Sequence, residues 1–289
     1  MDQSAELGSF LRTRRAALRP RDVVTTPIAG RRRVPGLRRE ELAQLAGVSV
    51  AYYTRLEQGR GRNVSDAVLD AIARALRLNE TERSHLHDLA RITREPPAYP
   101  RPERLRPQLQ SMVEAISDVP AYVVDRYADV LAWNSPAHAL LAGHVDFDAP
   151  YGCADRPNLQ RLLFLDPRTR LLYRDWSSRT RVAVGCLRRM ASRYPGDRRL
   201  GELVGELTSR SPEFSALWSS HPVLQCGFST ESYRHPVVGE ITLRHEVMDL
   251  PGDAGQQFVM VTAEPETPSH ATLGLLTRVR EPVRPYASR

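Results

Sequence analysis

The chain has 289 residues and a formal net charge of +7, from 41 basic residues that are all arginine and 34 acidic residues. This length favours two domains, and 41% hydrophobic residues suffice for ordinary buried cores, which excludes a chain that is disordered, collagen-like or a coiled coil throughout. No run approaches the ~18 apolar residues of a membrane-spanning helix, and the N-terminus lacks the apolar segment of a signal peptide. We therefore expect a cytoplasmic protein with no membrane partner.

The positive charge is concentrated at the start of the chain. Residues 1–62 hold 13 arginines and 6 acidic residues, whereas residues 63–289 hold 28 of each. Such asymmetry suggests a polyanionic partner for the basic part alone. The absence of lysine has a simpler explanation, a GC-rich genome whose codons favour arginine.

The first helix is predicted over residues 5–18, where apolar residues recur at helical spacing beside three arginines. A polar connection follows over 19–36 and carries the basic run 31–33, which either tracks phosphates or remains without fixed structure. We expect it to be exposed, because it is long for a connection between helices.

Two short helices are predicted next, over 38–46 and 50–58. Gly47 permits the positive φ of a tight turn, and Ser49 is placed to cap the second helix. In that second helix Tyr53 and Leu56 fall on one face, which we assign to the core, and the opposite face is left free. Two more helices follow, one capped by Ser65 and one by Asn79 with Glu82 at capping-box spacing.

These residues resemble the Xre, or lambda-repressor-like, helix-turn-helix family. The matching phrases are Glu41-Leu42-Ala43-x-x-Ala46-Gly47-Val48-Ser49, Leu56-Glu57-x-Gly59 and Ala73-x-Ala75-Leu76. The resemblance implies an all-α DNA-binding domain over 1–93, whose recognition helix at 50–58 enters the major groove of an operator.

The same resemblance supplies the expected DNA contacts. Arg55 is the strongest candidate, because arginine bonds bidentately to guanine. Arg38 and Arg39 match positions that touch the DNA backbone, although they could instead only keep their helix soluble. Tyr52 could stack on a sugar or lie at the rim of the core. The full set of predicted DNA-binding residues is Arg38, Arg39, Ser49, Val50, Ala51, Tyr52, Thr54 and Arg55.

A Pro-rich linker is predicted over 94–104, because residues 94–107 contain five prolines, which disfavour a helix. Beyond it we expect a helix near 105–117, strands at 121–125 and 130–133, and a short helix capped by Asn134 or Ser135. Helices capped by polar residues then fill 158–219. The last third changes to a period of two, which predicts the strands 231–235, 240–250 and 256–264.

Strands at both ends with helices between them indicate an α+β domain, with one antiparallel sheet of about five strands holding a helical insert against one face. This part of the chain resembles the MmyB-like regulators, in the phrases Asp129-Val130-Leu131-Ala132-Trp133-Asn134, Leu162-Leu163-Phe164-Leu165-Asp166-Pro167, Arg210-Ser211-Pro212-Glu213-Phe214, His235-Pro236-x-x-Gly239-Glu240 and Thr262-Ala263-Glu264-Pro265. The resemblance implies a PAS-like ligand-binding domain over 105–278, followed by a tail over 279–289, with a hydrophobic pocket for a fatty-acyl-like molecule.

A cavity between the sheet and the helices would be lined by aromatic and apolar side chains, with a histidine or an arginine at its mouth. The residues that we expect to contact the ligand are Trp133, Phe164, Trp218, Leu243 and His245. The alternative for the aromatic residues is an ordinary core.

An enzymatic function has no specific support. No GxSxG motif occurs, a GxxxxGK[ST] phosphate loop is impossible without lysine, and no HxxxH or HExxH motif suggests a metal site. His235 and His245 fall on neighbouring predicted strands and would have to meet in space to act together. Three widely spaced cysteines do not make a disulfide scaffold. We therefore predict no catalytic residue, no metal and no cofactor.

The sequence thus predicts a homodimeric DNA-binding transcriptional regulator that senses a small hydrophobic molecule, because one small helix-turn-helix module rarely gives enough affinity alone. Two alternatives remain open: an enzyme tethered to DNA, and a constitutive architectural protein without a ligand.

Overall fold

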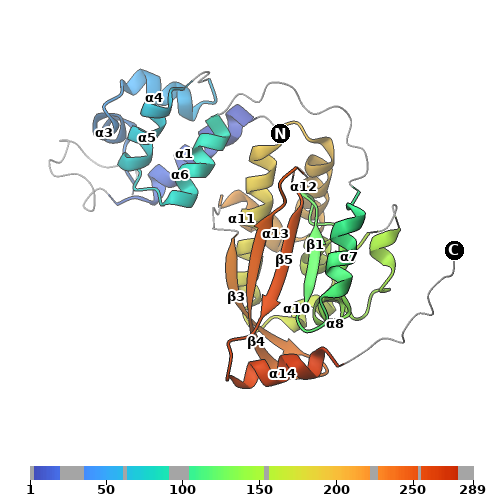
Figure 1. Ribbon diagram of the computed structural model, residues 1–289. Coiled ribbons are helices and arrows are strands. Elements are labelled where there is room, and N and C mark those ends of the chain that lie inside the picture. The colour runs from blue at the N-terminus through green and yellow to red at the C-terminus, as the bar shows by residue number, and fades with distance from the viewer. Residues whose placement is uncertain are drawn as a thin grey trace. The chain divides into compact units, whose positions relative to one another are not determined.

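The computed structural model describes residues 3–19, 36–60, 64–90, 104–152, 156–221, 227–252 and 255–278. The basic run 31–33, nearly all of the expected linker and the expected tail over 279–289 lie outside these residues. The chain divides into two compact units, one built on the N-terminal helices and one on a β-sheet (Figure 1).

The first unit is all-helical, as predicted. Its amphipathic helices enclose one core in which Phe10, Leu42 and Tyr53 are fully buried. The helix α1 packs against both α4 and α6, and α3 packs against α4 and α5. The helices are α1 (Gln3–Ala17), α3 (Arg39–Ala46), α4 (Val50–Glu57), α5 (Asp66–Ala75) and α6 (Glu80–Ala90).

The predicted helix ends are mostly confirmed. Gly47 has a φ of 67° and ends α3 in the left-handed region, and the Ser49 hydroxyl accepts a hydrogen bond from the Tyr52 amide at 3.1 Å. Asn79 and Glu82 form the reciprocal bonds of a capping box, at 2.9 and 3.0 Å. Ser65 precedes α5 with an extended backbone, but its side chain makes no capping hydrogen bond.

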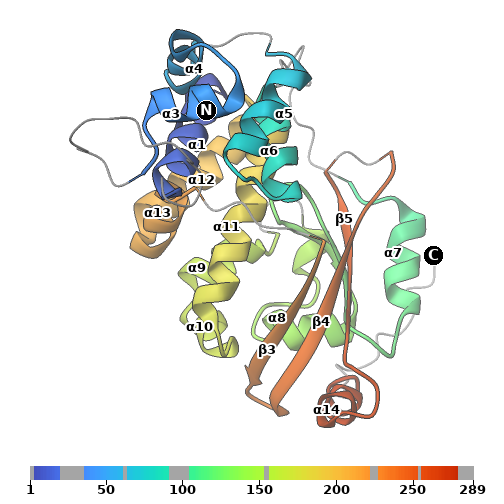
Figure 2. The same cartoon turned by 90° about the vertical axis from the view of Figure 1, so that its left-hand side faces the viewer.

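The second unit holds a five-stranded antiparallel sheet in the order β2-β1-β5-β4-β3, of which Figure 2 labels β3, β4 and β5. This confirms the α+β class. The long hairpin of β3 and β4 pairs His235 with Gly239, which has a φ of 80° at the turn. The strands are β1 (Ala121–Val124), β2 (Val130–Trp133), β3 (Phe228–His235), β4 (Gly239–Asp249) and β5 (Gln257–Thr262).

Polar caps start the helices of the second unit, as the sequence predicts. Asn134, Asn158 and Asp166 accept backbone N–H bonds at the starts of α8, α9 and α10. The helices of the second unit are α7 (Pro107–Ala115), α8 (Ser135–Ala142), α9 (Leu159–Leu165), α10 (Pro167–Leu172) and α14 (Pro268–Leu276). The helices α11 (Trp176–Arg193), α12 (Arg198–Arg210) and α13 (Pro212–Ser219) are divided between the two units, because residues 188–204 and 216–224 belong to the first.

The expectation of helices on a single face of the sheet is incomplete. The main core lies on the inner face, where α8, α9 and α11 pack against the strands. Val113 of α7 belongs to a second cluster on the other face, with Val123 of β1 and Phe258 of β5. The helix α14, which the sequence reading missed, packs on β4 and α8.

We expect Gly8→Ala to destabilise the first unit. A Cβ on Gly8 would lie 2.4 Å from the backbone oxygen of Glu57, so α1 would have to move away from the end of α4. Overpacking of this kind costs about 1–3 kcal/mol, and thermal unfolding followed by circular dichroism measures it. The control is Gly205→Ala on α12, where a Cβ meets nothing within 4 Å. Equal melting of the two variants would contradict the close approach.

Candidate DNA-binding and ligand-binding sites

The outward face of α4 carries most of the predicted base-reading residues. Val50 is 42% exposed, Ala51 and Arg55 are exposed, and Thr54 is half-buried. Tyr53 and Leu56 are fully buried, as the two-face assignment requires. The recognition-helix surface, defined here as Ser49, Val50, Ala51, Tyr52, Thr54 and Arg55, is thus continuous along one side of α4.

Arg55 and Tyr52 lie together on this surface. The guanidinium of Arg55 lies 5.8 Å from the centroid of the half-buried Tyr52 ring. This distance is within the range of a cation–π interaction, so the ring limits the orientations of the arginine.

The two backbone-contact candidates begin α3. Arg38 occupies the N-cap position, and its amide donates to the Glu41 carboxylate at 2.7 Å. The side chain of Arg39 is 44% exposed, and its Nε atom donates to the Glu57 carboxylate at 2.7 Å. Arg39 therefore stabilises the core of the unit through its ion pair with Glu57, independently of any contact between its remaining N–H groups and phosphate.

The Glu57 carboxylate is the buried centre of the first unit. Its side chain is 0% exposed, and Arg15 donates to both carboxylate oxygens, at 2.6 and 3.2 Å. Burial alone would raise the pKa of Glu57, but the hydrogen bonds from Arg15 and Arg39 outweigh it and lower the pKa below its usual 4.5. Glu57 therefore remains ionised and joins α1, α3 and α4. In the sequence, Glu57 belongs to the phrase Leu56-Glu57-x-Gly59 that resembles the helix-turn-helix family, but the sequence alone predicts no role for its side chain.

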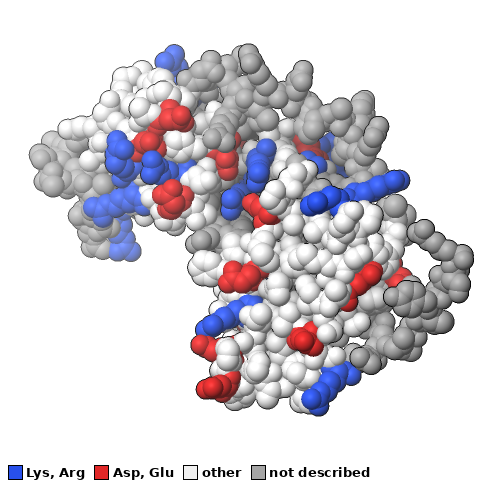
Figure 3. Space-filling model, viewed as in Figure 1, with Lys and Arg blue, Asp and Glu red and all other residues white. Residues whose placement is uncertain are grey.

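The charges of the first unit are mixed on the face shown in Figure 3, where blue arginine atoms lie next to red carboxylates. Part of this pattern is internal pairing, since Arg14 lies 3.4 Å from Glu82 and Arg83 lies 3.0 Å from Asp70. Among the described residues, the excess of arginine in this part of the chain therefore does not form one uniform basic face.

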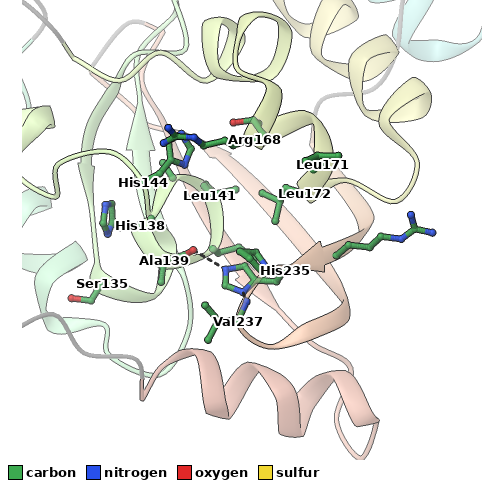
Figure 4. Close-up of a pocket in the computed structure, with 16 residues that line it drawn as sticks. Ser135, His138, Ala139, Leu141, His144, Arg168, Leu171, Leu172, His235 and Val237 are labelled. Carbon is green, nitrogen blue, oxygen red and sulfur yellow. Dashed lines mark hydrogen bonds between the residues drawn. The ribbon is translucent and has the colours of Figure 1, made fainter.

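The second unit contains an apolar cavity of about 520 Å³ between α8, α10 and the turn from β3 to β4 (Figure 4). Exposed apolar side chains stand at its rim, with Leu171 76% and Val237 67% exposed. Such groups are unusual on a surface that faces only water. The cavity is lined by Ser135, His138, Ala139, Leu140, Leu141, Ala142, Gly143, His144, Arg168, Thr169, Leu171, Leu172, Arg234, His235, Pro236 and Val237.

Seven of the sixteen lining residues are polar or charged. Arg168 and His144 lie at the same end of the cavity in Figure 4, and His144 bonds Asp166 at 2.5 Å. The imidazole of His235 donates from Nε2 to the Ala139 carbonyl at 2.9 Å and accepts at Nδ1 from the Val237 amide, so both ring nitrogens have partners within the protein. Arg168 and Arg234 are the exposed arginines among the residues that line the cavity.

None of the five expected ligand-contacting residues lines this cavity. Trp133 is fully buried and donates its indole N–H to the Phe147 carbonyl at 2.9 Å. Phe164 packs edge-on against Phe214, at 5.1 Å between ring centroids. The Trp218 ring lies under the Arg188 guanidinium, at 4.0 Å.

The other two expected residues lie on the inner face of the sheet. Leu243 is fully buried in the main core. His245 lines a second, smaller space of about 130 Å³, which we call the polar chamber because Arg179, Glu231 and Gln160 also line it. The five residues are thus not brought together around one ligand.

The residues of the apolar cavity do have a signal in the sequence. Arg168 and Thr169 directly follow the phrase that ends in Asp166-Pro167, and His235 begins the phrase His235-Pro236. The two phrases are far apart in the chain and flank the same cavity. The residues directly after the first phrase and those that begin the second therefore indicate the cavity in the sequence, whereas the aromatic residues do not.

The remaining candidates behave as structural groups. His235 and His245 do not meet, because His245 pairs in register with Ser229 and its Nε2 atom bonds the Tyr233 hydroxyl at 2.6 Å. Among the described residues, no group of three His, Cys, Asp or Glu side chains could hold a metal ion. Cys186 is disulfide-bonded rather than a free core residue, and the other two cysteines lie outside the described residues. Within the described part of the chain, no helix is long and apolar enough to cross a membrane.

Comparison with known families accounts for both units. The model of a helix-turn-helix domain matches residues 6–86, and the model of the MmyB-like transcription regulator ligand binding domain matches residues 105–276. A search of curated proteins found no significant match to the chain. Together the two domains define a helix-turn-helix transcription regulator that responds to a ligand. The chain belongs to the family with the MmyB-like transcription regulator ligand binding domain, and the narrower Xre assignment stays a prediction.

We expect Glu57→Gln to destabilise the first unit by about 3–5 kcal/mol at pH 7, because it removes the buried negative charge that pairs with Arg15 and Arg39. A carboxylate whose folded-state pKa is depressed contributes stability above its unfolded pKa and loses it as pH falls through the folded value. The wild-type protein should therefore lose stability between about pH 5 and pH 3, and the variant should show a shallower dependence.

Urea unfolding of the full chain across this pH range measures both effects. Glu40→Gln, an exposed position on the same helix as Arg39, is the matched control. A variant at Glu57 that unfolds with the same pH dependence as the control would show that its charge does not stabilise the unit.

Proposed function

We propose that this regulator binds its operator as a homodimer through the recognition-helix surface, and that it senses a fatty-acyl-like molecule in the apolar cavity of its second unit. The observation that carries the proposal is the pairing of an outward, arginine-bearing face on α4 with an apolar cavity of about 520 Å³ in the ligand-binding domain.

The DNA half of the proposal rests on how α4 is held. Its inner side is fixed by Leu56 and by the ion pairs of Glu57, so Arg55 projects from a rigid helix. Rigid placement suits direct reading of base edges in the major groove. Two such modules in a homodimer would supply the affinity and specificity that one small module lacks.

The ligand half rests on the chemistry of the cavity. Its volume lies within the range typical of small-molecule sites, about 300–1,000 Å³, and its lining is mainly aliphatic. Leu141 and Leu172 suit an alkyl chain, and the exposed Arg168 at the mouth suits a carboxylate. A fatty acid combines these two groups in one molecule.

We expect Arg55→Ala to weaken operator binding by about 1–3 kcal/mol and to relax specificity at one base position, because a bidentate contact to guanine is lost. The operator is first selected from random duplex DNA with the full chain, and affinities are then measured by fluorescence anisotropy. Arg74→Ala, at an exposed position of α5, is the control. Unchanged affinity and specificity at position 55 would show that another face of the unit reads DNA.

We expect Arg168→Gln to weaken the binding of dodecanoate roughly two- to fivefold, because an exposed ion pair contributes modestly. Binding of dodecanol, which lacks the carboxylate, should not change. Calorimetric titration of the full chain measures both ligands, and Arg174→Gln, an exposed arginine outside the cavity, is the control. Equal losses for the acid and the alcohol would place the headgroup elsewhere, and the absence of binding by both would contradict the apolar site.

A further inference from the structure

The polar chamber lies between the inner face of the sheet and the helices α9 and α11. Its volume is about 130 Å³, and a smaller space of about 20 Å³ continues it, sharing Tyr122, Arg179 and His245. The chamber has no lining residue in common with the apolar cavity, whereas Leu141 and Thr169 line both that cavity and the smaller space. The chamber is therefore a separate candidate site.

Two side chains of opposite charge line the chamber and form no ion pair with each other. Arg179 reaches it from α11 and Glu231 from β3, and both side chains are only partly exposed. No ion pair or hydrogen bond connects these two residues in the described part of the chain, although they interact electrostatically. Charges removed from water are costly unless a partner compensates them. Burial accordingly raises the pKa of Glu231.

A third polar group points to a ligand that carries hydrogen-bond donors. Gln160 is only 7% exposed, and its Nε2 atom donates to the Ala183 carbonyl at 3.1 Å. Its Oε1 atom is buried and has no hydrogen-bond partner. A buried acceptor without a partner is costly, so a donor from a bound molecule would stabilise it.

The other polar side chains that line the chamber carry no charge. His245 lines the chamber and shares a 2.6 Å hydrogen bond with the hydroxyl of Tyr233, which does not line it. Burial lowers the pKa of His245 to about 3, so its imidazole is neutral. Val182, Val247 and Val259 supply apolar surface beside these groups. The chamber thus offers the cation of Arg179 and the carboxylate of Glu231, with the neutral polar side chains of Gln160, Ser229 and Gln257 beside an apolar patch.

We propose that the polar chamber binds a free α-amino acid with a medium-sized apolar side chain. The ligand carboxylate would bond Arg179, and its ammonium group would donate to Glu231 and to the Oε1 atom of Gln160. The side chain would lie on the valines.

The first test compares a zwitterion with its two singly charged analogues on the unaltered full chain. L-leucine is the probe, 4-methylpentanoate lacks its ammonium group, and 3-methylbutylamine lacks its carboxylate. Calorimetric titration should show L-leucine binding at least about tenfold more tightly than either analogue, because each analogue contacts only one of the two charged side chains. Equal binding of the three, or no saturable binding of L-leucine and L-phenylalanine at millimolar concentration, overturns the proposal.

The second test changes the chamber. Arg179→Gln and Glu231→Gln should each weaken L-leucine binding at least about tenfold. Arg181→Gln, an exposed arginine two residues further along α11, should not weaken it. Retained melting temperature and dodecanoate binding show that the variants are folded. L-leucine binding that survives both substitutions overturns the proposal, and the comparison of analogues on the unaltered chain stands if a variant fails to fold.

Discussion

The buried carboxylate of Glu57 is the constraint on which the first unit depends. A charge with no exposure to water has to be compensated inside the protein, and Arg15 of α1 and Arg39 of α3 do so at 2.6 and 2.7 Å. The same region admits no side chain on Gly8, and Gly59 has a φ of 70° with a Cβ position only 2.8 Å from the Ser4 carbonyl. Charge pairing and close backbone approach therefore fix the end of α4 against α1. The outward direction of Arg55 follows from them.

Asn134 has a comparable role in the second unit, at the end of β2. Its Oδ1 atom accepts from the amides of Ala121 and Ala137, both at 3.0 Å, and its Nδ2 atom donates to the carbonyls of Ile116 and Val119. One amide side chain thus satisfies four backbone groups of α7, β1, α8 and their connections. A buried side chain with every hydrogen bond made specifies one local arrangement. The position of α8, and with it one wall of the apolar cavity, depends on this arrangement.

The sequence predicts what is local. Periodicity and caps such as Asn79 with Glu82 predict the helices of the first unit because the interacting atoms are three residues apart. The cavities depend on contacts between distant segments, such as the bond from His235 to the Ala139 carbonyl, for which no local pattern exists. Trp133 illustrates the difference. The sequence leaves it either a ligand contact or an ordinary core residue, and in the structure it is fully buried, donates its indole N–H to the Phe147 carbonyl and does not line the apolar cavity. The helix α14 was missed because Pro268, which here follows the cap Thr267, also fits a turn.

The short helix α10 connects the two proposed sites. It contributes Arg168, Thr169 and Leu172 to the apolar cavity, and Thr169 also reaches the small space beside the polar chamber. The Thr169 hydroxyl is buried and lacks a hydrogen-bond partner, so its environment depends on what fills either space. A ligand changes a conformational equilibrium only through different affinities for its two states. An amino acid that stabilises one position of α10 would therefore change the affinity for the lipid, and the lipid would change the affinity for the amino acid by the same factor. A regulator built in this way would respond to the combination of two metabolites rather than to either one alone.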